Sequence, residues 1–261
     1  MRYAFSTLGV PGMGVEEVVG LAVRSGYEGV ELRAAEDEPV HAGLGRRERE
    51  RVAAEFGRAG VEVLAVCGYA RIAAEGDDAP VLREIRELLR LAADLGAPFV
   101  RVFPGGGRDR AGSDAAAARR LGAAAETAAG IGVRILLETH DSHPAGADVA
   151  RVLRRVDHPH TGAIWDVLHP WLGGEEPAAA HTALAPFLGY VQVKDVASRD
   201  DLAPLPLGAG ALPLAECLSG LTPGTWLSWE YEKRWHPGAP ELPALLEPGR
   251  RHLESLLAAT P

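Results

Sequence analysis

The chain has 261 residues, of which 47% are hydrophobic and 24% are charged, and its formal net charge is −9. This balance is ordinary for a folded globular protein and excludes a disordered chain. An acidic chain repels nucleic acids and anionic membranes, and two cysteines, Cys67 and Cys217, are too few for a disulfide framework.

Short apolar runs alternate with longer amphipathic stretches along the first half of the chain. Helices are predicted wherever apolar residues recur at helical spacing, and each one ends at or near a glycine. The predicted strands are 3–8, 29–32, 61–66 and 99–103, and the predicted helices are 15–25, 46–59 and 81–95.

The second half of the chain repeats the same alternation without a linker. The predicted strands are 133–138, 161–166, 190–194 and 226–232, and the predicted helices are 114–129, 147–156, 176–184, 212–218 and 242–257. Strands that alternate with helices indicate a parallel sheet with helices outside it. Eight such units predict an α/β fold, a single (β/α)8 TIM barrel over residues 1–261, with an open doubly wound sheet as the alternative.

Polar residues stand at the ends of the last four predicted strands. The active site of such a barrel lies at the carboxyl ends of its strands, where inward side chains meet. Alternation along each strand places Glu138, Asp166, Gln192 and Glu230 at similar heights. We therefore expect these four side chains to converge inside the barrel.

Three carboxylates in one confined site repel each other, and a divalent cation removes that conflict. Carboxylates with an amide oxygen make a hard oxygen site that suits Mg²⁺ or Mn²⁺. Such an ion binds a carbonyl and a neighbouring hydroxyl oxygen and stabilises an enediolate, while a glutamate beside it moves the carbon-bound proton. The predicted cofactor is one divalent ion, Mn²⁺ or Mg²⁺, with Co²⁺ and Zn²⁺ as alternatives.

Some of these acidic residues also have simpler explanations. Asp166 can instead cap the next turn, and Glu232 can pair with Arg234 at the rim rather than replace Glu230 as a ligand. Only two of the 27 lysine and arginine residues are lysines, Lys194 and Lys233. Because lysine is so rare in this chain, Lys194 is less readily explained as an ordinary solvent-exposed surface charge.

The motifs around these residues resemble the xylose isomerase-like TIM-barrel superfamily, which includes sugar-phosphate isomerases, epimerases and the second family of apurinic endonucleases. The resemblance covers nearly the whole chain. Its motifs are the segments at 29–33, 100–103, 137–140, 165–169, 191–195 and 229–237.

The resemblance implies a metal held by Glu138, Asp166, Gln192 and Glu230, with Gln192 standing where many epimerases have histidine. It also implies that Glu138 and Glu230 are the acid/base pair, because the ligating glutamates move the proton in epimerase relatives. Gln192 raises the alternative of a dehydratase, since some dehydratases of the superfamily are similar in this respect.

Four further residues are candidates around this centre. His169 resembles a superfamily histidine near the substrate oxygens, or it is a rim histidine. Lys194 either acts on the substrate or pairs with an acid, Asp195 or Glu232. Arg101 either binds a substrate anion or pairs with Glu31, and His140 is expected to line the pocket.

The loops suggest how a substrate is bound. Trp171 is the candidate for an apolar wall of the pocket, together with Trp229 and Trp235. The glycine-rich segment 104–107 either cradles an anion with its backbone amides or is a flexible rim loop.

The leading hypothesis is a metal-dependent isomerase or epimerase of a keto sugar or cyclitol. The first alternative is a lyase of the 3-dehydroshikimate or inosose dehydratase type, and the second is a non-catalytic metal-binding barrel. A repair endonuclease is disfavoured, because the second and third strands end without histidine and the chain is acidic.

The expected partner is a small sugar, cyclitol or hydroxy-keto acid, with no nucleic acid or membrane and with a homo-oligomer as an option. No apolar run reaches the ~18 residues of a transmembrane helix. The N-terminus lacks the apolar core of a signal peptide, so the cytoplasm is the expected location.

Overall fold

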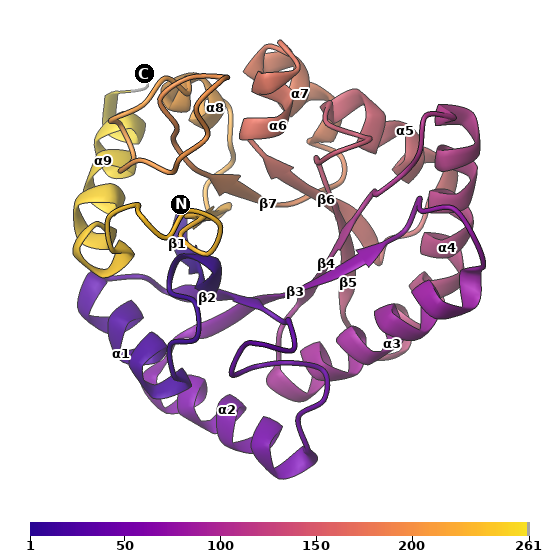
Figure 1. Ribbon diagram of the computed structural model, residues 1–261, viewed down its shortest axis with the longest axis horizontal. Coiled ribbons are helices and arrows are strands. Elements are labelled where there is room, and N and C mark those ends of the chain that lie inside the picture. Colours follow the sequence, from indigo (N-terminus) through magenta and orange to yellow (C-terminus); the bar gives the residue numbers. More distant parts are fainter. Residues whose placement is uncertain (260–261) are drawn as a thin grey trace.

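The chain forms one closed barrel of parallel strands with helices around it, as the sequence predicts. Figure 1 shows the computed structural model, in which the ring of helices surrounds the strands. The structure describes residues 1–259, so the last two residues of the domain predicted over 1–261 lie outside the described residues.

The strands follow each other around the barrel in chain order, and β8 pairs with β1 to close it. Every neighbouring pair is parallel, as βα repeats require. The strands are β1 Arg2–Ser6, β2 Gly29–Arg33, β3 Glu62–Arg71, β4 Phe99–Phe103, β5 Arg134–Glu138, β6 Thr161–Asp166, β7 Leu188–Val193 and β8 Trp226–Trp229.

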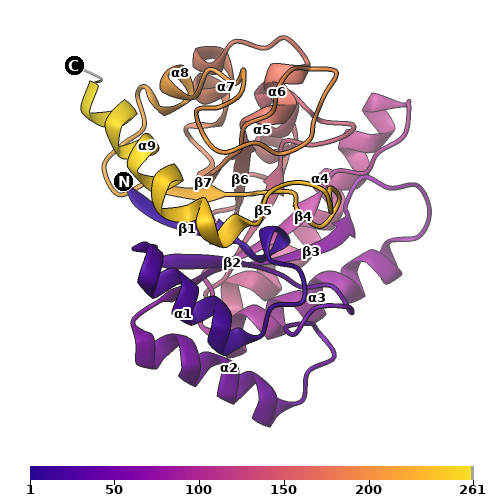
Figure 2. The same ribbon diagram turned by 60° about the vertical axis from the view of Figure 1, so that its left-hand side comes forward.

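The helices cover the outside of the barrel, and Figure 2 shows α1 and α2 on the opposite side from α6 and α7. Among the described residues, short 3-10 helices at Thr7–Gly9 and Leu242–Ala244 accompany them. The helices are α1 Val15–Ser25, α2 Arg46–Ala59, α3 Asp78–Leu95, α4 Arg110–Gly130, α5 Gly146–Val156, α6 Leu168–Leu172, α7 Pro177–Leu184, α8 Leu214–Leu218 and α9 Leu246–Ala259.

Local chemistry sets the ends of the helices. At the start of α1, the side chain of Glu17 accepts a hydrogen bond from the Gly14 backbone N–H at 3.3 Å. At the end of α3, Gly96 adopts a φ of +72°, a left-handed conformation in which its N–H reaches back to the last turn. The chain then turns directly into β4.

The apolar core has two parts. One part packs between the strands and the helices, where residues such as Ile85 and Leu89 of α3 are fully buried. The other lies inside the barrel and includes Leu64, Leu136 and Ile164. This inner part closes the barrel below the carboxyl ends of the strands.

Several element boundaries differ from the sequence predictions, and one helix was not predicted. β1 ends at Ser6, because its hydroxyl accepts a hydrogen bond from Leu8 N and starts a 3-10 turn. β3 continues past its apolar run to Arg71, and β8 ends at Trp229. The five-residue helix α6 was not predicted, since one turn and a half gives no readable periodicity.

Candidate active site

Polar side chains fill the barrel interior just beyond its apolar layer. On β5, Leu136 belongs to the inner core, and Glu138, two residues later, points the same way. Ile164 and Asp166 repeat this order on β6. The change from apolar to polar therefore happens at one height, at the carboxyl ends of the strands.

The three predicted carboxylates come together at this level. Glu138, Asp166 and Glu230 each offer an oxygen, and these oxygens lie within 4.8 Å of one another. Their residues are 1%, 0% and 4% exposed. Glu230 follows the last residue of β8, and its N–H still donates to Val193 O at 3.0 Å. Glu232 is not part of this group.

Arg101 reaches the cluster from β4. Its Nη1 donates to Glu138 Oε2 at 3.1 Å and to Glu230 Oε1 at 3.4 Å, and its Nη2 donates to Gly68 O. The predicted pairing with Glu31 is not observed. Two of these three hydrogen bonds go to carboxylates, so the Arg101 side chain is bound to the acidic cluster.

Lys194 is the second cation at the cluster. Its ammonium lies 2.8 Å from Asp166 Oδ2, 2.5 Å from Glu230 Oε2 and 3.0 Å from Glu232 Oε1. The predicted pairing with Glu232 is therefore present, together with two contacts that the sequence did not indicate.

Asp195, Arg234 and Asp166 also have partners outside the cluster of carboxylates. Asp195 does not pair with Lys194, because its carboxylate accepts backbone N–H groups such as those of Gly208 and Gly210, both at 2.9 Å. Arg234 pairs with Asp37 rather than with Glu232. Asp166 does cap the following turn, since its Oδ1 accepts from Leu168 N at 2.9 Å while Oδ2 faces the site.

Burial and charge shift the ionisation of the cluster in opposite directions. Burial, opposed by Arg101 and reinforced by Glu230, raises the pKa of Glu138 to about 8. Burial also acts on Asp166, but Lys194, His169 and the Leu168 N–H together outweigh it and hold the pKa of that carboxyl below its usual value. Glu138 therefore carries a proton at neutral pH when no further cation is present.

Gln192 lies between two carboxylates. Its Nε2 donates to both oxygens of Glu31 at 3.1 Å and to Glu230 Oε1 at 3.2 Å. Its Oε1 is fully buried without a hydrogen-bond partner. A buried carbonyl-type oxygen without a donor is costly unless a cation or water takes it. The donor set thus fits a hard divalent cation. Glu31, which the sequence suggested only as a partner of Arg101, instead holds the Gln192 amide.

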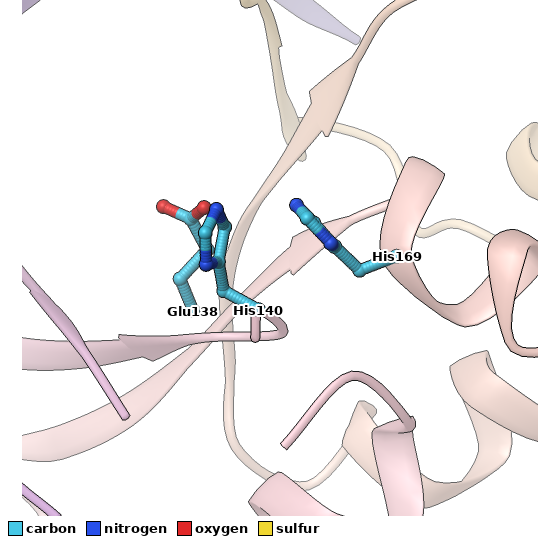
Figure 3. Close-up of side chains that lie close together, drawn as sticks. All are labelled: Glu138, His140 and His169. Carbon is cyan, nitrogen blue, oxygen red and sulfur yellow. The ribbon is translucent and has the colours of Figure 1, made fainter. Parts of the chain in front are cut away.

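His140 and His169 lie beside the acidic cluster. Figure 3 shows the two imidazoles facing each other, with Glu138 next to His140, and the ring centroids are 4.1 Å apart. His140 Nδ1 lies 3.3 Å from Asp141 Oδ2, though not in the direction of a hydrogen bond. His169 Nε2 lies 3.5 Å from Asp166 Oδ2. One nitrogen from each histidine and one oxygen of Glu138 also lie within 4.8 Å of one another.

The two histidines titrate differently. Burial lowers the pKa of His140, but Asp141 and the carboxylates of the cluster outweigh it, so the net shift is upward. Burial lowers the pKa of His169 to about 4, against the opposing charge of Asp166. His169 is therefore neutral at pH 7 and can accept a proton.

A cavity of about 210 Å³ opens onto the cluster. Leu8, Tyr69 and Arg71 belong to this wall, although the sequence analysis did not indicate them, because no recognisable motif surrounds them. The lining residues are Leu8, Tyr69, Arg71, Arg101, Phe103, Glu138, His140, Asp141, Glu230, Glu232 and Trp235.

The three tryptophans named as wall candidates lie in different places. Trp235 is on the wall, whereas Trp229 is fully buried in the core. Trp171 is absent from the lining, and the guanidinium of Arg199 lies 5.0 Å from its ring. The structure therefore does not bring Trp171 to this cavity.

The glycine-rich segment uses its amides within the chain. Gly105 N donates to Asp141 Oδ1 at 2.9 Å, and Gly106 N donates to Ser142 Oγ at 2.8 Å. Because both amides already have acceptors, they do not form an open anion cradle.

Two observations concern the rest of the surface. A larger groove of about 740 Å³, lined by residues such as His41 and Arg49, shares no residue with the cavity at the cluster.

Within residues 1–259, no helix combines the length and apolar character needed to cross a membrane.

Comparison with solved structures identifies the fold. The D-psicose 3-epimerase of Clostridium cellulolyticum H10 has a TM-score of 0.82 and 14% identity, over 98% of this chain and 99% of that chain. The probable 3-DHS dehydratase AsbF of Bacillus anthracis has a TM-score of 0.79 and 20% identity, over 97% and 99%. The IOLI protein with a bound zinc atom has a TM-score of 0.80 and 15% identity, over 99% and 97%.

Among curated proteins, no sequence matches this chain. The family model described as the xylose isomerase-like TIM barrel matches residues 19–256, which is most of the chain. The closed barrel of eight parallel strands agrees with that match. The chain therefore belongs to the xylose isomerase-like TIM-barrel family.

Proposed function

We propose that this protein is a divalent-metal-dependent isomerase or epimerase, which moves a proton on the carbon next to the carbonyl of a keto sugar or cyclitol. The observation that carries the proposal is the approach of the Glu138, Asp166 and Glu230 oxygens to within 4.8 Å in a buried site. Solved sugar epimerases with the same fold support it.

Glu138, Asp166, Glu230 and the free Oε1 of Gln192 are the groups that would hold the metal. Four oxygen donors favour Mn²⁺ or Mg²⁺, and the neighbouring His140 and His169 keep Co²⁺ and Zn²⁺ as alternatives. A bound divalent ion polarises a carbonyl oxygen and stabilises the negative charge that develops there.

The glutamates would move the proton. Glu138 is protonated at neutral pH in the bare site, and added positive charge favours its carboxylate form. It can then accept the carbon-bound proton and release it to water, while Glu230, which contacts the same Arg101 nitrogen, would take a proton from water and deliver it to the opposite face. Arg101 contacts both groups and so fixes their relative position.

A dehydratase is the second candidate, because a buried ammonium stands beside the cluster. Lys194 lies 2.5 Å from Glu230 and is itself 3% exposed, and the opposing charges keep its pKa well above the usual value. In an elimination, the base takes the carbon-bound proton, the electron pair forms a C=C bond, and Lys194 protonates the departing hydroxyl as water. The neutral His169 is a further base within this site.

Metal content tests the proposed site first. We expect about one Mn, Mg, Co or Zn per chain in protein purified without chelators, as measured by plasma mass spectrometry. Glu230→Ala should lose the metal, whereas Glu232→Ala should keep it, because Glu232 lies outside the carboxylate group. If wild-type protein neither contains metal nor takes it up, the proposed metal-dependent reaction is wrong.

Reaction type is tested on metal-loaded enzyme with a panel of keto sugars, cyclitols and hydroxy-keto acids in deuterated water. Isomerisation or epimerisation gives a product of unchanged composition that carries solvent deuterium, whereas elimination gives loss of water. Glu138→Gln should lower kcat by about 10²–10⁴-fold, the usual contribution of a general base. Full activity in that variant would contradict the assigned role.

A further inference from the structure

The charged side chains on the wall of the 210 Å³ cavity are nearly all paired within the chain. Arg101 contacts Glu138 and Glu230, and Glu232 contacts Lys194. Asp141 accepts the N–H groups of Gly105 and Ser142. Arg71 is the exception among the charged residues of this wall. Its side chain makes no ion pair or hydrogen bond with any residue in the described range 1–259.

Packing positions the aliphatic part of Arg71, an exposed residue on the cavity wall. Arg71 is the last residue of β3, and its backbone pairs with Phe103 of β4. A Cβ at Gly105 would lie 2.6 Å from both Cβ and Cγ of Arg71, so only glycine leaves room for this stem. The stem therefore lies directly over the Gly105 backbone, and the exposed guanidinium keeps its donors free.

Aromatic rings flank the same mouth. Tyr69 and Phe103 have ring centroids 5.8 Å apart, and the Tyr69 hydroxyl accepts a hydrogen bond from Arg33 Nε at 2.7 Å. Trp235 is 52% exposed although it lines the cavity. Small-molecule sites combine such aromatic walls with a few free polar groups that set orientation.

We propose that Arg71 binds an anionic group, a carboxylate or a phosphate, on a small hydroxylated substrate whose carbonyl end lies at the Glu138 and Glu230 cluster. A planar guanidinium with free donors is well suited to bind either anion with two hydrogen bonds. This inference rests on the proposed function for the position of the carbonyl end.

The two ends of the cavity differ in the way such a substrate requires. Glu138 and Glu230 lie at the buried floor, and the cations there, Arg101 and Lys194, are already paired with carboxylates. Arg71 lies at the exposed mouth, so the anion is held away from those carboxylates. An anionic substrate is thereby oriented with its carbonyl end inward, and a neutral sugar lacks that constraint.

Binding of three matched probes to Mn²⁺-loaded protein tests the assignment. D-glucose, D-glucuronate and D-glucose 6-phosphate share a hydroxylated ring and differ in the group at one end. We expect calorimetry to give a dissociation constant about tenfold lower or more for at least one anionic probe than for D-glucose, as for a hydrogen-bonded charge pair. The anionic probe that binds more tightly shows whether a carboxylate or a phosphate is the preferred anion.

Arg71→Gln should abolish this preference without affecting folding, since the guanidinium has no partner to lose. Arg108→Gln, which removes the same charge from an exposed residue outside the cavity lining, should retain it. Equal binding of all probes by wild-type protein, or a preference that survives Arg71→Gln, overturns the inference. A preference that depends on Arg71 in a protein that binds no Mn²⁺ upholds it and contradicts the proposed metal chemistry instead.

Discussion

Glu31 determines how Gln192 presents its carboxamide. Both oxygens of Glu31 accept from Gln192 Nε2 at 3.1 Å, and Tyr190 donates its hydroxyl to Glu31 Oε2 at 2.8 Å. With the amide nitrogen held on Glu31, the Gln192 oxygen is the atom left free for a cation. Carboxylates behind metal ligands commonly orient those ligands in this way.

We expect Glu31→Gln to weaken Mn²⁺ binding by about 10–100-fold, the usual cost of losing a group that orients a ligand. Without the acceptor carboxylate, the Gln192 amide is no longer fixed in one orientation. Calorimetric titration of metal-free protein with Mn²⁺ measures the change directly, without an assay of activity.

The same substitution in a Gln192→Ala background is the control for this prediction. If Glu31 acts through Gln192, Glu31→Gln adds little further loss once that side chain is gone. An equal loss of affinity in both backgrounds would assign Glu31 a separate, purely electrostatic role.

At the residue scale, strand alternation predicted that Glu138, Asp166, Gln192 and Glu230 converge inside the barrel, and the structure has these buried side chains close together. It did not predict the partners of Arg101. A long side chain inside a barrel reaches several acids at once, so the choice of Glu138 and Glu230 over Glu31 depends on distances that spacing along the chain does not encode.

At the scale of elements, the connection between β3 and α3 is held by a buried arginine of α4. Arg120 Nη1 donates to Ile72 O at 3.0 Å and to Ala74 O at 2.7 Å, and Nη2 donates to Gly76 O at 2.7 Å. These carbonyls directly follow Arg71, so Arg120 also stabilises the rim of the cavity.

We expect Arg120→Met to lower the free energy of unfolding by about 3 kcal/mol, because it leaves the buried carbonyl of Ile72 and the half-buried carbonyl of Ala74 without a donor. Urea unfolding measures this loss. The neighbour Arg119 contacts the same Asp78 but is mostly exposed, so Arg119→Met should shift the midpoint far less. Equal shifts for both variants would mean that the contact with Asp78, rather than the buried carbonyls, accounts for the stability.

The elements that sequence patterns missed are those whose limits depend on tertiary contacts. The apolar run on β3 ends before Arg71, yet backbone pairing with β4 carries the strand that far. Helix α6, which carries both His169 and Trp171, is too short for a periodic signal and contains Pro170. Its geometry places His169 at the cluster and Trp171 away from the cavity.

At the scale of the whole molecule, the ionisation of Glu138 links the stability of the barrel to pH. Between about pH 6.5 and 8, folded metal-free protein keeps a proton on Glu138, whose pKa burial raises to about 8 from its ordinary value of 4.5. The unfolded chain has lost that proton, so stability falls as the pH rises. His140, whose pKa is also raised, acts in the same direction.

We therefore expect the free energy of unfolding of metal-free protein to fall between pH 6.5 and 8, with Glu138 contributing at most about 1.4 kcal/mol per pH unit. Urea unfolding in the presence of a chelator checks the slope. Glu138→Gln cannot ionise and should flatten it. A wild-type slope of zero or of the opposite sign would show that Glu138 is already ionised in the bare site.

The regular alternation of eight units was sufficient to predict the closed barrel, because few architectures accommodate eight successive βα repeats. The cavity was less predictable. Its wall combines Leu8, Tyr69, Phe103 and Trp235, which come from four separate parts of the chain, and only the assembled barrel brings them together.

The pairing of β1 with β8 has a consequence for biosynthesis. Ala4 pairs with Ser228 and Phe5 with Trp229. During synthesis, β1 therefore lacks its β8 partner until the last strand of the barrel has been translated. Until then, the nascent sheet exposes an open edge whose backbone groups can pair with another chain. The time needed to translate the intervening residues thus sets how long the newborn protein depends on chaperones or on its own helices to shield that edge.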